Sequence, residues 1–304
     1  MVVTMLNGKV ETGAETKRTA GMTAVPDNLY LDLMKKALLA SIYEQNGWYV
    51  LGSIRGGVAS FKAWLQSLIV KLAWTRRLVI VKPGVVDADS WGLFAYTMIG
   101  LPRLNNIQAC VEDVIRNGIK GDLIETGVWR GGATIFMRAI LKAHGVTDRT
   151  VWVADSFEGL PAIKAEDALY TQDAIDVAGM NEGGPLQLGL AVSLERVKEN
   201  FAKFDLLDDQ VRFLKGWFSD TLATAPIKKL AILRLDGDMY QSTMAALNAL
   251  YSKVSEGGYV IVDDYNCWPH CKQAVDDFRK THGIREEIIE IDKYGVFWRV
   301  SGGR

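Results

Sequence analysis

The chain has 304 residues, of which 49% are hydrophobic and 23% are charged. This composition is typical of a globular protein with a sizeable core and excludes a disordered chain. The formal charge of -1 lacks the basic excess of proteins that bind phosphate backbones. We therefore expect a small-molecule partner and no nucleic acid.

The cysteine count and the first residues bear on the compartment. Three cysteines, an odd number, do not suggest the disulfide framework of a secreted protein. Residues 1–22 mix charges with Gly and Thr and lack the apolar run of a signal peptide. We expect a cytoplasmic protein that begins with a loose tail.

Apolar residues at helix-like intervals predict an amphipathic helix over residues 28–45. The next stretch, residues 48–81, has apolar clusters separated by a Gly pair and an Arg pair. Its segment FKAWLQSLIVKLAW fits either a membrane-surface helix or a helix that packs on the main domain or on a second subunit. Two lysines interrupt the run, and it is too short to span a bilayer. We favour packing, and expect no integral membrane association and a homodimer or higher homo-oligomer.

From residue 90 onward, strand and helix patterns alternate with short connections. This alternation predicts an α/β fold with a doubly wound, mostly parallel sheet and helices on both faces. Ligands of such sheets bind beyond the carboxyl ends of the strands. The last two apolar runs, EEIIEID and GVFWRV, predict an antiparallel pair at the sheet edge. The predicted strands are residues 122–126, 150–155, 211–216, 230–238, 259–265 and 295–300.

The first candidate binding motif is DLIETGVWRGGATIF, where a strand ends at Glu125 and a Gly-containing loop leads into a helix. Gly127, Gly131 and Gly132 allow a ligand to approach the backbone closely. The motif is not the GxGxxG dinucleotide fingerprint, because a pyrophosphate would be repelled by the carboxylate of Glu125. A cationic sulfonium would tolerate it, which favours S-adenosylmethionine. The alternative is an ordinary strand-helix turn.

The next predicted strand ends in Asp155, within VWVADSFEGLP. An acidic residue there is placed to accept hydrogen bonds from ribose hydroxyls. Its alternative role is to cap the turn that follows.

Two later strands, LRLDGD and YVIVDDY, end in pairs of carboxylates. Adjacent parallel strands lie about 5 Å apart, so Asp236, Asp263 and Asp264 are expected to converge on one point. Converging carboxylates need a cation, and oxygen ligands favour Mg²⁺ before Ca²⁺ or Mn²⁺. In the alternative interpretation some of them pair with Arg234 or Lys272, or cap helices.

A zinc site at Cys267, His270 and Cys271 is disfavoured. Only three potential ligands lie together, and no second CxxC pair accompanies them. The segment also contains Pro269, which is typical of a loop that enters a helix.

These motifs together resemble the macrocin-type family of S-adenosylmethionine-dependent and Mg²⁺-dependent O-methyltransferases, known for methylating sugar hydroxyls on macrolide and aminocoumarin natural products. The resemblance covers roughly residues 97–300. It implies a Rossmann-like fold of the class I methyltransferase type with an N-terminal helical lid. The segments are then a tail over residues 1–24, a helical extension or lid over 25–89 and a methyltransferase domain over 90–304.

Carried over position by position, the resemblance implies two sets of contacts. The metal ligands are Asp236, Asp263 and Asp264. The cofactor contacts are Thr97, Met98, Glu125, Thr126, Gly127, Val128, Trp129, Asp155, Ser156, Phe157, Glu158, Gly159, Gly216, Trp217 and Phe218.

The expected reaction is in-line methyl transfer to a hydroxyl of a sugar or polyketide acceptor. Mg²⁺ would acidify and align two adjacent hydroxyls. Asp236 is the chosen general base, with Asp238 and His270 as alternatives.

Three other functions are alternatives for this sequence. The first is a catechol- or phenol-type O-methyltransferase, whose usual third metal ligand is Asn where this chain has Asp264. The others are a nucleotide-binding Rossmann enzyme, and a scaffold protein that retains the fold without activity.

Overall fold

A seven-stranded sheet forms the centre of the protein. The structure, a computed structural model, describes residues 28–42, 95–161 and 190–302. The strand order is β3-β2-β1-β4-β5-β7-β6; the first five strands run parallel, and β7 is antiparallel to β5 and to β6. The predicted doubly wound sheet and its antiparallel edge are thus confirmed. The strands are β1 Asp122–Thr126, β2 Val151–Asp155, β3 Val211–Lys215, β4 Leu230–Leu235, β5 Val254–Val262, β6 Ile289–Glu290 and β7 Val296–Arg299.

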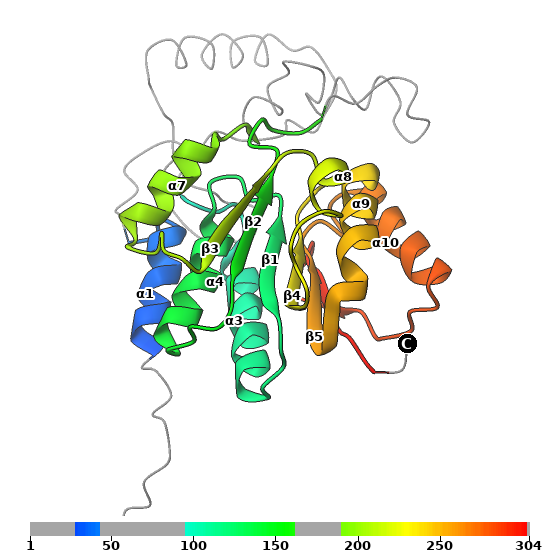
Figure 1. The fold of residues 1–304 in the computed structure, drawn as a ribbon, viewed down its shortest axis with the longest axis horizontal. Coiled ribbons are helices and arrows are strands. Elements are labelled where there is room, and N and C mark those ends of the chain that lie inside the picture. Colours follow the sequence, from blue (N-terminus) through cyan, green and yellow to red (C-terminus); the bar gives the residue numbers. More distant parts are fainter. Residues whose placement is uncertain (1–27, 43–94, 162–189, 303–304) are drawn as a thin grey trace, which may run out of the picture.

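Helices cover both faces of this sheet. Figure 1 shows α1, α3, α4 and α7 on one side and α8, α9 and α10 on the other. The N-terminal helix α1 packs on α4, and α9 packs on α10. The helices are α1 Asn28–Leu38, α3 Leu101–Arg116, α4 Gly132–Ala143, α7 Leu194–Lys203, α8 Phe218–Thr221, α9 Tyr240–Leu250 and α10 Pro269–Thr281, with a 3-10 turn at Tyr251–Lys253.

Alternation along the strands divides the core between the two faces, because successive side chains of a strand point to opposite sides. Leu123 and Val153 join the apolar cluster under α1, α3, α4 and α7. Their neighbours Ile124 and Ala154 join the cluster under α9 and α10. With both faces covered, β2 is a continuous apolar run that ends in Asp155, and β1 is buried from Leu123 to Thr126 although it ends in Glu125 and Thr126. The polar ends all lie at one edge of the sheet.

Some boundaries differ from the predictions for local reasons. The first helix ends at Leu38, not residue 45, because the chain leaves the helix through Ala40 at φ 56°. The fourth strand ends at Leu235, not residue 238, because Asp238 turns the chain at φ 55°. The 48–81 segment and the N-terminal tail lie outside the described residues, so their predicted roles and the predicted domain limits stay predictions.

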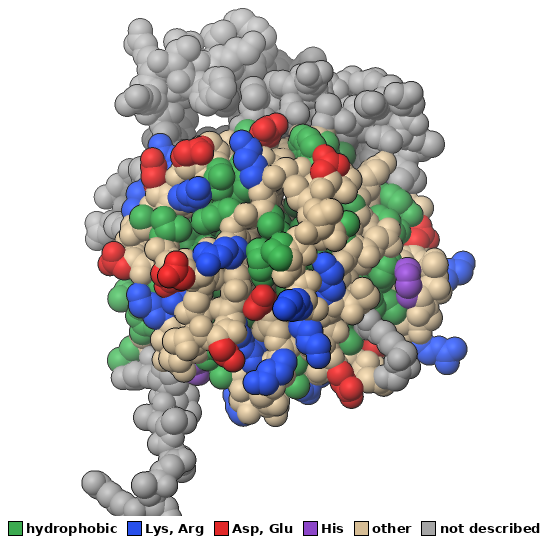
Figure 2. All heavy atoms as spheres, viewed as in Figure 1, with side chains coloured by type: hydrophobic (Ala, Val, Ile, Leu, Met, Phe, Trp, Pro, Cys, Tyr) green, Lys and Arg blue, Asp and Glu red, His purple; other side chains and the backbone are tan. Residues whose placement is uncertain are grey.

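The described surface is mixed in charge. Figure 2 shows Lys and Arg side chains together with Asp and Glu side chains over the face in view. Within the described ranges, no helix combines the length and the apolar character needed to cross a bilayer.

Candidate active site

The loop between β1 and α4 passes between the ends of β2 and β4. Gly127 donates its N–H to the Ala154 carbonyl at 2.8 Å and has φ 88°. A Cβ at this position would lie 1.8 Å from the carbonyl oxygen of Asp236. Only glycine fits such a left-handed, close-packed position, so the glycine predicted to allow close approach is required first by the neighbouring strand.

A short segment, residues 95–100, lies across the same loop. Arg130 donates to the Ala95 carbonyl at 2.8 Å, and Gly132 donates its N–H to the Tyr96 carbonyl at 2.9 Å. A Cβ on Gly132 would lie 2.4 Å from that carbonyl. The Arg130 guanidinium also stacks on the Trp129 ring at 4.2 Å, and Trp129 adopts φ 47°, which is unusual for a bulky residue. The loop is therefore held in one shape from both sides.

Asp155, at the end of β2, holds the loop through hydrogen bonds to its backbone. It accepts hydrogen bonds from the N–H of Val128 and the N–H of Phe157, both at 2.7 Å. Burial raises the pKa of Asp155, and these N–H groups oppose the rise. The carboxylate still borders the central cavity. The alternative turn-capping role is thus observed, and the predicted ribose contact stays a prediction for a side chain that borders the cavity.

A cavity of about 250 Å³ opens at this edge of the sheet. Nine of the residues predicted as cofactor or metal contacts line it: Met98, Gly127, Trp129, Asp155, Ser156, Gly159, Trp217, Phe218 and Asp236. Seven predicted cofactor contacts do not: Thr97, Glu125, Thr126, Val128, Phe157, Glu158 and Gly216.

Most residues of the second group stand behind the wall or point away from it. Thr97 is buried and accepts the N–H of Ile99 at 3.3 Å, and Gly216 donates to the Asp155 carbonyl at 3.0 Å. Glu158 is exposed to solvent. These residues support the cavity's frame or its rim.

The prediction missed part of the lining on α9. Gln241, Ser242 and Ala245 border the cavity and stand in the first turns after the acidic end of β4. Positions 241 and 245 are four apart and share one helix face, a signal in the sequence that would have found them. The remaining lining residues are Asp238, one of the alternative general bases, and Leu160, Pro161, Leu190, Ser219 and Gly237.

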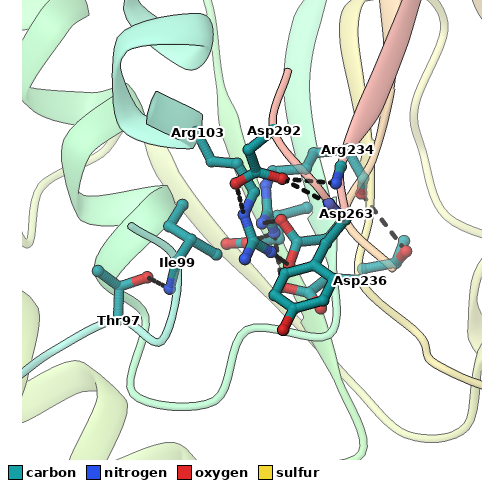
Figure 3. Close-up of polar contacts among 11 residues, drawn as sticks. Thr97, Ile99, Arg103, Arg234, Asp236, Asp263 and Asp292 are labelled. Carbon is teal, nitrogen blue, oxygen red and sulfur yellow. Dashed lines mark hydrogen bonds and ion pairs between the residues drawn. The ribbon is translucent and has the colours of Figure 1, made fainter. Parts of the chain in front are cut away.

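Beneath the cavity lies a buried guanidinium. Arg234 is fully buried on β4 and pairs with Glu125 of β1 and with Asp263 after β5, and it binds Asp236 at 2.7 Å (Figure 3). Burial raises the pKa of Glu125 to about 8, an effect that Arg234 opposes. The second oxygen of Glu125, Oε2, is buried without a hydrogen-bond partner. The alternative in which strand-end carboxylates pair with Arg234 therefore holds for Asp236 and Asp263.

Three carboxylates cluster beside this network. Asp236, Asp238 and Asp264 each place one oxygen within 4.8 Å of the others. Burial raises the pKa of Asp238 to about 7 and also raises the pKa of Asp264, and the negative charges of the neighbouring aspartates add to both shifts. The Oδ2 atom of Asp264 is buried without a hydrogen-bond partner. Within the described residues, this is the one group of His, Cys, Asp and Glu with the spacing of a metal site, so Cys267, His270 and Cys271 form none.

The composition of this trio differs from the predicted metal set. Asp263 is not part of it, and Asp238 takes its place. Both oxygens of Asp263 face guanidinium groups, one from Arg234 and one from Arg103 on α3. Asp263 and Asp264 follow directly on the end of β5 and take different partners: Asp263 contacts the arginines of β4 and α3, and Asp264 joins the trio.

The chain is similar to known O-methyltransferases in sequence and in fold. A family model described as macrocin-O-methyltransferase (TylF) matches residues 27–300. Demethyldecarbamoylnovobiocin O-methyltransferase of Streptomyces niveus is 49% identical over 281 residues, covering 92% of this chain and 97% of the relative. 8-Demethyl-8-(2,3-dimethoxy-alpha-L-rhamnosyl)-tetracenomycin-C 4'-O-methyltransferase of Streptomyces olivaceus is 46% identical, covering 91% and 95%. The solved structure of the O-methyltransferase NovP has a TM-score of 0.73 and 48% identity, covering 90% of this chain and 99% of that one.

Proposed function

The chain belongs to the macrocin-O-methyltransferase (TylF) family and is an S-adenosylmethionine-dependent O-methyltransferase, and from this premise we propose that its acceptor is a sugar hydroxyl of a glycosylated natural product. The observation that carries the proposal is the carboxylate trio, two of whose members, Asp236 and Asp238, border the same cavity as the glycine loop. Two adjacent hydroxyls, as sugars present them, suit a cation held by oxygen ligands. The rhamnosyl acceptor named for one relative supports this choice.

The cavity wall suits S-adenosylmethionine, which supplies an electrophilic methyl group on a sulfonium centre. Gly127 keeps the loop backbone open, Asp155 borders the cavity, and Trp129 offers an aromatic wall. The unpartnered Oε2 of Glu125 stands at the end of β1, just before this loop. A buried acceptor of that kind favours a cationic ligand group over a pyrophosphate. We propose the cofactor contacts on these residues.

The trio suits a hard divalent cation. Its members offer oxygen ligands only. The Oδ2 atom of Asp264 is buried without a hydrogen-bond partner, and a cation would supply one. We propose Asp236, Asp238 and Asp264 as the holders of Mg²⁺, with Asp263 as their neighbour in the second layer. When bound, the ion lowers the pKa of a hydroxyl that it contacts.

Asp236 is the residue we propose to accept the hydroxyl proton. Arg234 fixes one of its oxygens, Oδ2, at 2.7 Å, while the side chain borders the cavity. A carboxylate held in this way keeps its orientation when an acceptor enters, which general-base catalysis requires. Gln241 and Ser242, which border the same space, are placed to hydrogen-bond further acceptor hydroxyls.

Calorimetric titration with S-adenosylhomocysteine tests the cofactor site, with NAD⁺ as the competing ligand. We expect micromolar binding of the first and none of the second; NAD⁺ binding would reverse the assignment. Turnover is then measured on a glycoside with a vicinal diol, with the matching deoxy sugar as control, in Mg²⁺ and after chelation. Equal turnover of both sugars would argue against the diol, and undiminished turnover after chelation would argue against the cation.

A further inference from the structure

Arg103 joins two distant parts of the chain below the carboxylate trio. It lies in the first turn of α3, is 5% exposed, and donates through Nε to Asp292 at 3.0 Å while Nη1 pairs with Asp263. These partners are 189 and 160 residues away in the sequence. Figure 3 shows the guanidinium between the two carboxylates. A planar, five-donor group is suited to such a double contact, and a lysine is not.

The protein provides a fitted socket for this side chain. Asp292 is held by the N–H groups of Tyr294 at 2.9 Å and Gly295 at 2.8 Å, which bind its other oxygen. A Cβ on Gly295 would lie 3.1 Å from Cδ of Arg103, so the glycine leaves room for the arginine stem. The guanidinium also lies 5.6 Å from the centre of the Tyr294 ring. The turn before β7 thus fixes Arg103 on the side away from the cavity.

On its other side Arg103 contacts the charged residues beneath the cavity. Asp263 gives one oxygen to Arg103 and the other to Arg234, and Arg234 in turn binds Asp236. The result is a chain of alternating charges from Asp292 to Asp236. A buried carboxylate held by two guanidiniums has little freedom to turn.

We propose that Arg103 is a positioning residue for methyl transfer. By holding Asp263 on Arg234, it fixes the orientation of Asp236 at the cavity. This inference rests on the proposed cation-assisted function. Arg103 does not line the cavity, so it acts only through the residues that it holds.

The proposal has a signature that a general loss of packing would not produce. Without Arg103 the vicinity of the trio gains one net negative charge, and Asp263 loses one of its two guanidinium partners. Cation binding should then become tighter while turnover falls, because Asp236 is no longer fixed. General damage to the fold would weaken both properties together.

Arg103→Gln and Arg103→Lys test this signature, with Mn²⁺ as the cation probe and its dissociation constant read from the paramagnetic resonance of the free ion. For Arg103→Gln we expect Mn²⁺ to bind roughly three- to tenfold more tightly and kcat to fall about tenfold or more. Arg103→Lys keeps the charge but not the double contact. It should therefore lower kcat with Mn²⁺ affinity close to that of the wild type.

Two further variants complete the design. Arg138→Gln removes a different buried arginine, on α4, and with it the ion pair to Asp208. This variant should lower Tm without changing Mn²⁺ affinity. Asp292→Asn weakens only the contact of Arg103 with Asp292 and leaves Arg103 on Asp263. It replaces Arg103→Gln in the test if that variant does not fold. Its effects should have the same signs and be smaller.

The outcomes separate the inference from the proposed function. Unchanged kcat in Arg103→Gln, or weaker Mn²⁺ binding accompanied by a fall in Tm like that of Arg138→Gln, would overturn the positioning role. A wild-type protein that binds S-adenosylhomocysteine but neither binds Mn²⁺ nor loses turnover on chelation would overturn the cation proposal. In that case a fall in kcat for Arg103→Gln beyond that of Arg138→Gln would still support positioning of Asp236.

Discussion

The two halves of the site are built by different means. On the side of β1 and β2, the cavity wall is backbone: glycines, left-handed residues and N–H groups that Asp155 gathers. On the side of β4 and β5, the wall is made of ionisable side chains arranged around Arg234 and the carboxylate trio. A backbone wall is set by sterics and fails abruptly, whereas a wall of charges loses function while the fold survives. Mutations should separate these two behaviours.

The largest effect is expected at Gly127. Gly127→Ala would place a Cβ 1.8 Å from the Asp236 carbonyl, so binding of S-adenosylhomocysteine should fall below detection by calorimetry and Tm should drop. Gly118→Ala is the matched control, since Gly118 has a similar φ of 63° with nothing within 4 Å of the added atom. It should cost only about 1 kcal/mol of stability. Equal cofactor affinity in both variants would disprove the steric argument.

The charged half should lose turnover and keep the cofactor. Asp236→Asn removes the proposed base, and kcat should fall about a hundredfold or more while the affinity for S-adenosylhomocysteine stays near that of the wild type. Asp276→Asn is the control, because Asp276 binds Tyr265 and Lys272 away from the cavity. A parallel loss of cofactor binding in Asp236→Asn would show that the two halves are not separable.

Cation removal probes the same half without a mutation. Chelation should lower turnover to a level near that of Asp236→Asn, because without a cation the three carboxylates of the trio repel one another. Added Mg²⁺ should restore turnover. Calorimetry on the chelated protein should give an unchanged S-adenosylhomocysteine affinity. Recovery with Mg²⁺ in Asp264→Asn equal to that of the wild type would remove Asp264 from the ligand set.

A smaller loss is expected where Asp155 fastens the backbone wall. Asp155→Asn keeps the shape but removes the charge that the N–H groups of Val128 and Phe157 both contact, and one of them then faces an NH2 group in place of an acceptor oxygen. We expect S-adenosylhomocysteine to bind about tenfold more weakly with kcat at saturating cofactor nearly unchanged. A fall in kcat without a change in affinity would assign Asp155 to the chemical step.

The smallest effect concerns the helix that carries the loop. Arg138 of α4 holds Asp208, which lowers the pKa of that carboxylate. A lowered folded-state pKa adds stability above the unfolded pKa and loses it as the pH falls through the folded value. Because Asp208 is partly exposed, Asp208→Asn should cost only about 0.5–1 kcal/mol at neutral pH. Urea unfolding at pH 7 and below about pH 4 should show this difference shrinking in acid; a difference that grows would contradict the sign.

Much of this site was readable before the structure. The alternation of strand and helix patterns predicted the parallel sheet, and the polar residues at the strand ends predicted which edge carries the site, because parallel strands share one carboxyl edge. The same rule brought Asp155, Gly127 and Asp236 to one cavity. Local sequence decides these features, since each depends on a strand period or a backbone angle.

The partners of each charge were decided only in three dimensions. In the register of the sheet, Glu125 lies opposite Arg234, and α3 brings Arg103 to Asp263 from a segment 160 residues earlier. The sequence placed four aspartates near the edge, but the distribution of two arginines among them depends on register and helix packing. Buried charges must find partners wherever the fold offers them, so Asp263 went to the guanidiniums and Asp238 joined the trio.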